Sequence, residues 1–396
     1  MSVRLIRDIA VLSLIAAGCG ESVETGRNVD DLPRFVVEEE LRIGSVDDPD
    51  VGFSSIGAVA VGDDGLVHVL DRQEMAVRIY DDSGTMLTKL GAAGEGPGEF
   101  RMPVGIGLIG DTIWVHDLRL RRTSLFTRDG FVRALAMPTS QLTIPGLVGA
   151  QLIASGLRSD GLFDTSFMVP VMREMPTDSF WMPHTRMDTS GAIVDTIQMQ
   201  RYGFVNRATI DAGGAQLGVP SGPSHHPLWL DAGDEAFVIE RPVATSADAG
   251  EFTVTRIAGI ADTLFTDTFT YTPRQFTAAD TDSVIARAVA SYRSRPGMDA
   301  DAVMAAFHNA FSPPAFHPPI ASGRIGADGM LWLRRQDTGD PTAEWLVLTA
   351  DGEPYGIVTL PSGATVQWSA GTTLWTAVPD ELDVPWLVKH RLRPES

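Results

Sequence analysis

The chain has little cysteine and little positive charge. Cys19 is the only cysteine among 396 residues, so an intrachain disulfide is excluded. The 31 Lys and Arg residues are outnumbered by 51 Asp and Glu residues, which gives a formal net charge of -20. This balance disfavours nucleic acid as a partner, because the phosphate backbone selects basic surfaces. Its simplest consequence is a well-solvated surface.

The N-terminus has the layout of an export signal. Arg4 and Arg7 precede an apolar run from Ile9 to Ala17. That run is far shorter than the roughly 20 apolar residues of a membrane-spanning helix. It is followed by Ala-Ala-Gly-Cys, ending at Cys19, which resembles the lipobox of bacterial lipoproteins. The resemblance implies that Cys19 is lipidated and becomes the mature N-terminus.

These features predict the organisation of the first part of the chain. We expect a lipoprotein-type signal peptide over residues 1–19, a polar tether over 20–32 and one folded domain over 33–396. The expected location is the bacterial cell envelope, at the outer membrane or the periplasmic face in a Gram-negative cell, with the lipid as the membrane contact and the protein as a monomer.

Short glycine turns recur along the rest of the chain. Glycine supplies the positive φ of a tight hairpin turn, and apolar residues flank each turn. One set has Asp or Ser directly before the glycine: Gly84, Gly130, Gly191 and Gly352. A second set precedes an apolar strand: Gly65, Gly110, Gly233, Gly329 and Gly371. The sequence therefore predicts many antiparallel strands joined by tight turns.

The spacing of these turns predicts a β-propeller. Asp71 and Asp117 correspond in the first two repeats, 46 residues apart, and so do the turn glycines that follow them. A period in the forties with two hairpin turns per unit is typical of a four-stranded propeller blade. We expect an all-β fold with six blades, with seven possible if the third unit hides a degenerate repeat.

The expected blades can be placed along the chain. Their predicted bounds are 51–94, 95–138, 139–205, 206–271, 315–360 and 361 to the end. The strand-like segment from Arg34 to Gly44 is expected to pair into the last blade and close the ring, which removes exposed sheet edges. "GEGPGEFRMPVGI" and "TIWVHDLRLRRTSLFTRDG" resemble the NHL-repeat family and related six-bladed propeller lipoproteins of bacteria. The resemblance specifies a fold and no reaction.

The stretch "GAAGEGPGEFRMPVGI", residues 91–106, is expected to be a corner between two blades. A phosphate cradle would need a helix N-terminus directly after the glycines or a following Lys-Ser/Thr, and neither is present. We expect Phe100 and Pro103 to pack beneath this corner. Residues 272–311 instead predict a helical insertion of two helices between the fourth and fifth blades, with Thr277 as a cap. Val303, Phe307 and Phe311 would form its apolar face. Such an insert would shield an edge or cover the channel as a lid.

No catalytic motif is present, and the metal-site signals are weak. Propeller lactonases and related hydrolases hold calcium with Glu, Asn and Asp, but only three asparagines occur: Asn28, Asn206 and Asn309. Zinc lyases of the NHL type use histidines from separate blades. The adjacent pair His225 and His226 is the best local candidate, and His68 and His116 are expected to be satisfied structural residues. We therefore predict no metal or other cofactor, with calcium or zinc kept as the alternative.

Binding is the preferred function. The predicted module presents loops to an envelope protein, peptide or glycan, and the alternative is a metal-dependent hydrolase or lyase at the channel mouth. Large aromatic residues in the repeat strands, such as Trp332 and Trp375, are expected in the core rather than on a sugar-binding face. Loop placement alone selects the candidate binding-face residues: Glu99, Arg101, His225, His226 and His317.

Overall fold

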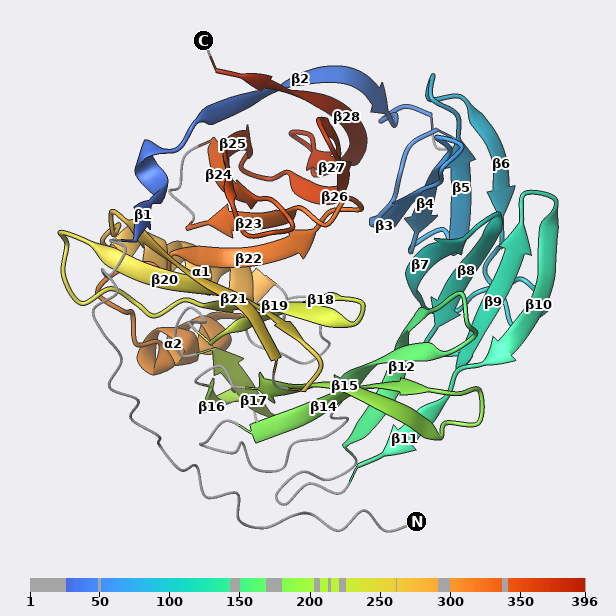
Figure 1. Cartoon of the computed structure of the whole chain (residues 1–396), viewed down its shortest axis with the longest axis horizontal. Helices are drawn as coiled ribbons and strands as arrows, with labels where there is room; N and C mark the ends of the chain where they lie inside the picture. The colour runs from blue at the N-terminus through green and yellow to red at the C-terminus, as the bar shows by residue number, and fades with distance from the viewer. Residues whose placement is uncertain are drawn as a thin grey trace.

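The computed structural model is an all-β protein whose sheets are arranged like the blades of a propeller (Figure 1). It describes residues 26–48, 51–142, 150–168, 180–202, 207–212, 215–220, 226–260, 262–290, 300–336 and 341–395. The innermost strands of neighbouring sheets contact one another, as β3 does with β7 and β26. The predicted all-β, propeller-like architecture is therefore confirmed.

Three antiparallel sheets follow one another in the first half of the chain. The first sheet contains β3 (Ile56–Val61), β4 (Val67–Asp71), β5 (Ala76–Tyr80) and β6 (Met86–Leu90). The second contains β7 (Pro103–Ile109), β8 (Thr112–Asp117), β9 (Arg122–Thr127) and β10 (Gly130–Ala136). The third contains β11 (Thr139–Gln141), β12 (Gln151–Leu157), β13 (Phe163–Met168), β14 (Phe180–Met187) and β15 (Ile193–Tyr202).

The second half holds the remaining sheets. A two-stranded sheet pairs β16 (Arg207–Ala212) with β17 (Ala215–Pro220). A five-stranded sheet adds β1 (Arg27–Asn28) to β18 (Leu228–Ala232), β19 (Glu235–Glu240), β20 (Gly250–Ala258) and β21 (Asp262–Tyr271). An eight-stranded sheet contains β22 (Ile320–Ile325), β23 (Leu331–Arg335), β24 (Thr342–Leu348), β25 (Pro354–Pro361), β2 (Arg34–Ile43), β28 (Pro385–Pro394), β27 (Thr373–Pro379) and β26 (Thr365–Ala370).

The strand near the N-terminus closes the ring. β2 pairs antiparallel with β28, from Phe35 opposite Pro394 to Ile43 opposite Leu387. This is the pairing that the sequence predicts for Arg34 to Gly44. Ile43 belongs to an apolar cluster that also contains Val67 of the first sheet and Trp375 of β27. The two ends of the ring are thus joined by a strand pairing and by a shared core.

The predicted turn glycines take the backbone conformation that tight turns require. The φ angles of Gly84, Gly191 and Gly352 are 83°, 85° and 87°. The amide of each of these glycines donates a hydrogen bond to the carbonyl three residues earlier, for example Gly84 N to Asp81 O at 3.1 Å. A substitution there would force a side chain into the left-handed region. An additional turn of this kind, at Gly161 between β12 and β13, was not predicted from the sequence.

The predicted glycine corner joins β6 to β7, as expected, and encloses apolar residues. Phe100 is fully buried under it, and a Cβ on Gly91 would lie 2.3 Å from the Phe100 ring. Arg122 fastens the corner by donating hydrogen bonds to the carbonyls of Glu95, Gly96 and Glu99. The structural interpretation of this glycine-rich stretch is therefore confirmed.

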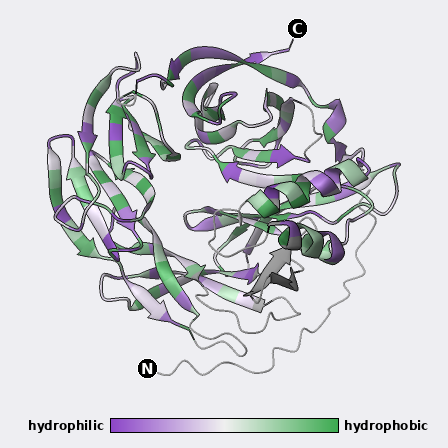
Figure 2. Cartoon of the chain, turned by 180° about the vertical axis from the view of Figure 1, so that it is seen from behind, coloured by the Kyte–Doolittle hydropathy of each residue, from purple (hydrophilic) through white to green (hydrophobic). Residues whose placement is uncertain are grey.

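Two helices interrupt the strand order between β21 and β22, as predicted. They are α1 (Ala278–Ala290) and α2 (Ala300–Ala310), and each carries separate apolar and polar stripes (Figure 2). Val303, Phe307 and Phe311 are buried between them, in the predicted face. α2 also packs against β16. None of the described helices is long and apolar enough to cross a bilayer.

The start of the folded body differs from the predicted boundary. Residues 26–32, which the sequence assigns to the tether, pack on the five-stranded sheet: Arg27 pairs with Phe269, and a 3-10 turn (Val29–Asp31) follows. Val29 is buried in the core, and Asp30 accepts a hydrogen bond from Arg335 at 2.7 Å. Burial of the apolar Val29 side chain stabilises the packing of this short segment on the sheet. Any tether therefore ends before Gly26.

The closing strand yields a stability prediction. Ile43 is 3% exposed, whereas Val36 on the same strand is 38% exposed. Ile43→Ala is expected to lower the free energy of unfolding by about 2–5 kcal/mol, because it leaves a cavity where the ends of the ring meet. Val36→Ala should change it by less than about 1 kcal/mol. Urea unfolding followed by circular dichroism measures both, and equal effects would contradict the role given to Ile43.

Candidate functional site

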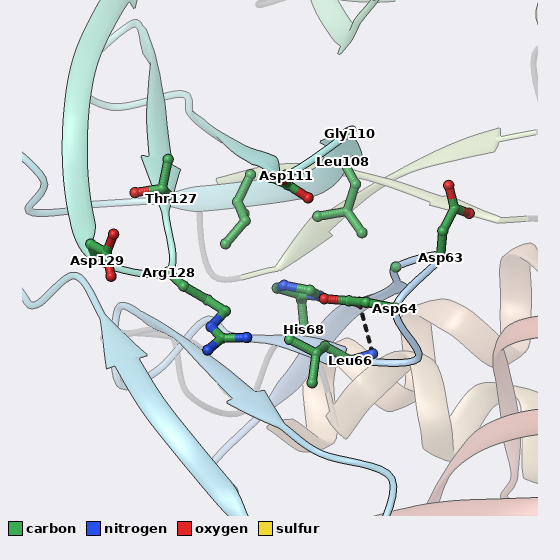
Figure 3. A pocket seen from close by; sticks show the side chains of 12 residues that line it. Asp63, Asp64, Leu66, His68, Leu108, Gly110, Asp111, Thr127, Arg128 and Asp129 are labelled. Atoms are coloured by element: carbon green, nitrogen blue, oxygen red, sulfur yellow. Dashed lines mark hydrogen bonds between the residues drawn. The ribbon is translucent and has the colours of Figure 1, made fainter.

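The candidate site is a pocket between the first and second sheets. It has a volume of about 500 Å³ and is lined by three turns: 62–66 between β3 and β4, 110–111 between β7 and β8, and 127–129 between β9 and β10 (Figure 3). His68 of β4 and Leu108 and Ile113 of the second sheet complete the lining. We call this cavity the intersheet pocket.

The strand order explains why these turns meet. In an antiparallel sheet of four consecutive strands, the first and third turns lie at one end, and the second turn and the exit lie at the other. We call these ends the turn face and the corner face. The intersheet pocket lies on the turn face. The predicted residues Glu99 and Arg101 lie in the β6–β7 connection, which is on the corner face.

The pocket has an acidic rim whose carboxylates are largely unused. Asp63, Asp111 and Asp129 form no hydrogen bond or ion pair with the residues that the structure describes. Asp64 accepts a hydrogen bond from the Leu66 amide through Oδ1, at 3.0 Å. Arg128 is the only cationic side chain in the lining, and four carboxylates therefore surround one guanidinium.

His68 lies among the lining residues in Figure 3. Its side chain is 5% exposed, and its Nδ1 atom is buried without a hydrogen-bond partner in the described part of the chain. Burial lowers the pKa of this imidazole below its usual value, because the charged form loses solvation. Hydrogen bonds to the backbone of Ala60 and Leu66 partly offset this effect, so the expectation that His68 is a satisfied structural histidine holds for part of the ring and not for Nδ1. A buried polar atom without a partner calls for an explanation, and a ligand is one.

His116, likewise expected to be a structural histidine, has one ring nitrogen paired and the other, Nε2, buried without a partner in the described part of the chain. Its Nδ1 atom lies 2.7 Å from Thr123 Oγ1 inside the second sheet. Burial lowers the pKa of His116 to about 4, so this side chain is neutral at pH 7.

Two of the predicted binding-face residues take part in the glycine corner. Glu99 accepts a hydrogen bond from the Gly96 amide at 2.7 Å, so its carboxylate holds the corner in shape. Arg101 is exposed and lies 3.3 Å from Glu95. Its backbone amide donates to Asp117 at 2.7 Å. The corner is well held by its own contacts, and its role in binding stays a prediction.

His317, the third predicted residue, belongs to a polar cluster beside α1. His317 is 8% exposed, and its ring packs at a tilt against Phe276, with centroids 4.4 Å apart. Nε2 lies 3.2 Å from Asp280 and contacts the Arg274 guanidinium. Asp280 also accepts from the Thr277 amide at 2.8 Å, while its own amide donates to Thr277 Oγ1 at 3.2 Å. The predicted cap Thr277 is confirmed, and the pair forms a capping box.

The polar cluster borders a second cavity, of about 430 Å³, between α1 and the turn that joins β25 to β26. Burial by itself raises the pKa of the Asp280 carboxyl, but hydrogen bonds from Thr277, Arg274 and His317 outweigh it and hold the pKa below its usual value. The carboxylate is therefore charged and fully used.

The predicted histidine pair is only partly within the described residues. His225 lies outside them. His226 stands just before β18, is half-buried, and its carbonyl accepts a hydrogen bond from Arg241 Nε at 2.8 Å. Figure 1 places β18 and α1 on the other side of the ring from β6 and β7, so the corner residues and His317 belong to separate regions.

The tryptophans follow the expectation where they lie in strands. Trp332 and Trp375 are buried, and Trp114 packs partly buried in the cluster between the second and third sheets. Trp181 is 58% exposed on β14. Of the three tryptophans that the sequence assigns to the core, Trp332 and Trp375 are confirmed there, and Trp114 is only partly buried.

Comparison with known proteins adds no assignment. No protein-family model matches the chain, and no curated protein matches its sequence. A member of the DUF4221 family from Bacteroides vulgatus is similar in structure, with a TM-score of 0.42, 10% identity and coverage of 91% of this chain and 98% of that one. Virginiamycin B lyase from Staphylococcus aureus has a TM-score of 0.39 and 13% identity, covering 90% of this chain and 99% of the lyase.

The calcium-binding protein regucalcin from Agrobacterium tumefaciens is similar at a TM-score of 0.38 and 11% identity, covering 92% of this chain and 98% of that one. Similarities this low carry no functional argument. The propeller-like class rests on the arrangement of the sheets in the chain itself.

The intersheet pocket is not predicted from the sequence, although three of its turns carry a signal. The turns "GDDG", "GD" and "TRDG" each place an aspartate at the end of a hairpin. Taken one at a time, they predict only separate hairpin turns. Asp63, Asp111 and Asp129 share one face because the first and third turns of each four-stranded sheet lie at the same end of that sheet, and this follows only from the strand order.

The Asp280 cluster gives a prediction about the helical insert. Asp280→Ala removes the acceptor of the capping box and the partner of Arg274. We therefore expect the free energy of unfolding to fall by about 1–2 kcal/mol and proteolytic cleavage within residues 278–310 to become faster. Asp280→Asn keeps one oxygen acceptor, so its cleavage rate should lie between those of Asp280→Ala and the wild type. Limited proteolysis followed by mass spectrometry measures the rate. Cleavage at the wild-type rate in Asp280→Ala would contradict this role.

Proposed function

We propose that the chain is an exported binding module, held to the bacterial cell envelope by a lipid on Cys19, and that it presents a six-bladed propeller to a protein, peptide or glycan. The observation that carries this function is the intersheet pocket. It offers three carboxylates that have no partner among the described residues, all on one face, which suits recognition of a partner.

The enzyme alternative has less support. A metal-dependent hydrolase or lyase needs several ligands that converge on one ion. The described residues contain no group of three or more His, Cys, Asp or Glu side chains able to hold a metal ion. His116 and His390 lie instead against Thr123 and Thr376, at 2.7 and 2.9 Å, inside separate sheets. Binding therefore remains the better interpretation.

The count of six blades rests on how the eight-stranded sheet divides. β2 and β25 are joined by a short parallel pairing of two residues, Arg34 with Ile357 and Phe35 with Val358. β2 pairs with β28 over most of its length. Division at the short pairing gives two four-stranded units, β22–β25 and β26–β28 with β2. Together with the units β3–β6, β7–β10, β12–β15 and β18–β21, this makes six, with β16 and β17 left as an insertion.

Metal content separates the two functions. The full chain, extracted in detergent and purified, is expected to contain no stoichiometric calcium or zinc. The reason is that the described residues contain no group of acidic, His or Cys side chains that converge on one ion. Elemental analysis before and after chelator treatment measures this. One equivalent of either metal per chain, whose removal lowers the melting temperature, would favour the metal-dependent enzyme instead.

The lipid anchor has its own test. Cys19→Ser removes the thiol that would carry the lipid, so this variant should leave the membrane fraction while the wild-type chain and a Gly20→Ser control remain in it. Fractionation with immunoblotting measures the distribution, and intact-mass measurement of the mature N-terminus identifies the modification. Equal membrane association of Cys19→Ser and wild type would show that the anchor is something else.

A further inference from the structure

We propose that the intersheet pocket binds the side chain of a lysine presented by a polypeptide partner. This inference rests on the proposed binding function and adds the chemistry of the group that is recognised. It follows from the charge of the rim, the character of the floor and the one buried acceptor in the lining.

The charge of the rim selects a cation. Asp63, Asp111 and Asp129 come from three different turns and have no partner within the described part of the chain. Carboxylates gathered on one face repel each other, and a positive group among them relieves that repulsion. With the Asp64 carboxylate added and the Arg128 guanidinium subtracted, the rim carries an excess of three negative charges.

The size of the pocket selects an organic cation over a metal ion. A calcium ion needs six to eight oxygens at about 2.3–2.6 Å from one point. The described residues include no group of three acidic or histidine side chains that could hold an ion, so these carboxylates surround the cavity without converging. A cavity of about 500 Å³ has room for a chain of several atoms.

The lining also suits the two parts of a lysine side chain. Leu66, Leu108 and Ile113 offer an apolar surface for an aliphatic stem, and the ammonium head can stay at the acidic rim. An ammonium has three N–H donors that point in different directions, so it can bind one carboxylate of the rim and a second acceptor of the lining at the same time. A planar guanidinium instead prefers one carboxylate in its own plane.

His68 supplies the buried acceptor. When the ring is neutral and protonated on Nε2, Nδ1 can accept a hydrogen bond, and no described residue donates one. An ammonium held at the rim beside His68 would satisfy that atom, which belongs to a residue that is only 5% exposed.

The charge of the whole molecule supports the same partner. A net charge of -20 attracts cationic segments over a distance and raises their rate of encounter. Arg128 acts against this attraction at the pocket itself, because it is exposed and forms no ion pair with the described residues. Its removal therefore distinguishes a cationic ligand from an anionic one.

The test uses the full chain in detergent and three peptides with blocked ends. The probe is acetyl-Gly-Gly-Lys-Gly-Gly-amide, and the controls replace the lysine by norleucine or by acetyl-lysine. Isothermal titration calorimetry is expected to show binding of the lysine peptide only, weakening as sodium chloride is raised, because the attraction is partly exposed to solvent. Comparable binding of the norleucine peptide would overturn the proposal.

Variants locate the binding. The triple substitution Asp63→Asn, Asp111→Asn and Asp129→Asn is expected to weaken lysine-peptide binding by about tenfold or more. Arg128→Gln should strengthen it several-fold. Asp82→Asn neutralises one carboxylate in the β5–β6 turn, outside the pocket lining, and should have no effect. Melting temperatures check that each variant is folded, and removal of like charges should not lower them.

Two results would overturn the inference: wild-type affinity in the triple variant, or weaker binding in Arg128→Gln. Cross-linking in the producing cells separates this failure from failure of the proposed function. If wild type and triple variant capture the same partner, the chain binds through another surface and only the pocket inference fails. If no partner is captured and no peptide binds, both fail.

Discussion

Closure of the ring by β2 is the constraint on which the rest of the structure depends. Strands from opposite ends of the chain pair in one sheet, β2 with β28, and their junction is filled by an apolar cluster that reaches into the first sheet. Without this pairing β28 would present a free edge. The apolar cluster at the junction holds the first sheet against the last strands of the chain, and β3 also contacts β7, so the turns of the first sheet keep a fixed position relative to those of the second sheet. The intersheet pocket is a consequence of that fixed position.

The two ends of each sheet use the same kind of side chain differently. On the corner face, Asp71 accepts hydrogen bonds from the amides of Ser54, Gln73 and Glu74, and Asp117 accepts from Arg101, Met102 and Leu120. Both side chains are fully buried, and their carboxylates hold the loops around them in place through these hydrogen bonds. On the turn face, Asp63, Asp111 and Asp129 of the pocket rim have no such partners among the described residues. These three carboxylates are available to a ligand, whereas those of Asp71 and Asp117 are not.

Much of the fold was predictable because tight turns have strict chemical requirements. Glycine at positive φ marked the hairpins at Gly84 and Gly352, and the strand period followed from their spacing. The closing strand was predictable because an unpaired edge in a ring needs a partner. The docked segment around Val29 was not, since one apolar residue in a polar stretch gives almost no periodic signal.

The candidate site was harder to predict because it depends on contacts between repeats. Loop position suggested Glu99 and His317, and the structure shows the carboxylate of the first and the ring of the second engaged by their own neighbours. The pocket required knowing that turns 46 residues apart share one face, and that His68 lies against them with an unused nitrogen. Burial of a single atom cannot be seen in a sequence without the packing of the sheets around it.

Hydrogen exchange measured by mass spectrometry, with and without the lysine peptide, tests the central claim most directly. A ligand in the intersheet pocket should slow exchange in residues 62–68, 108–113 and 127–130, which line the cavity, and leave residues 95–101 and 278–290 unchanged. Protection confined to the corner at Glu99 and Arg101, or to α1, would contradict the account and place binding on the opposite face.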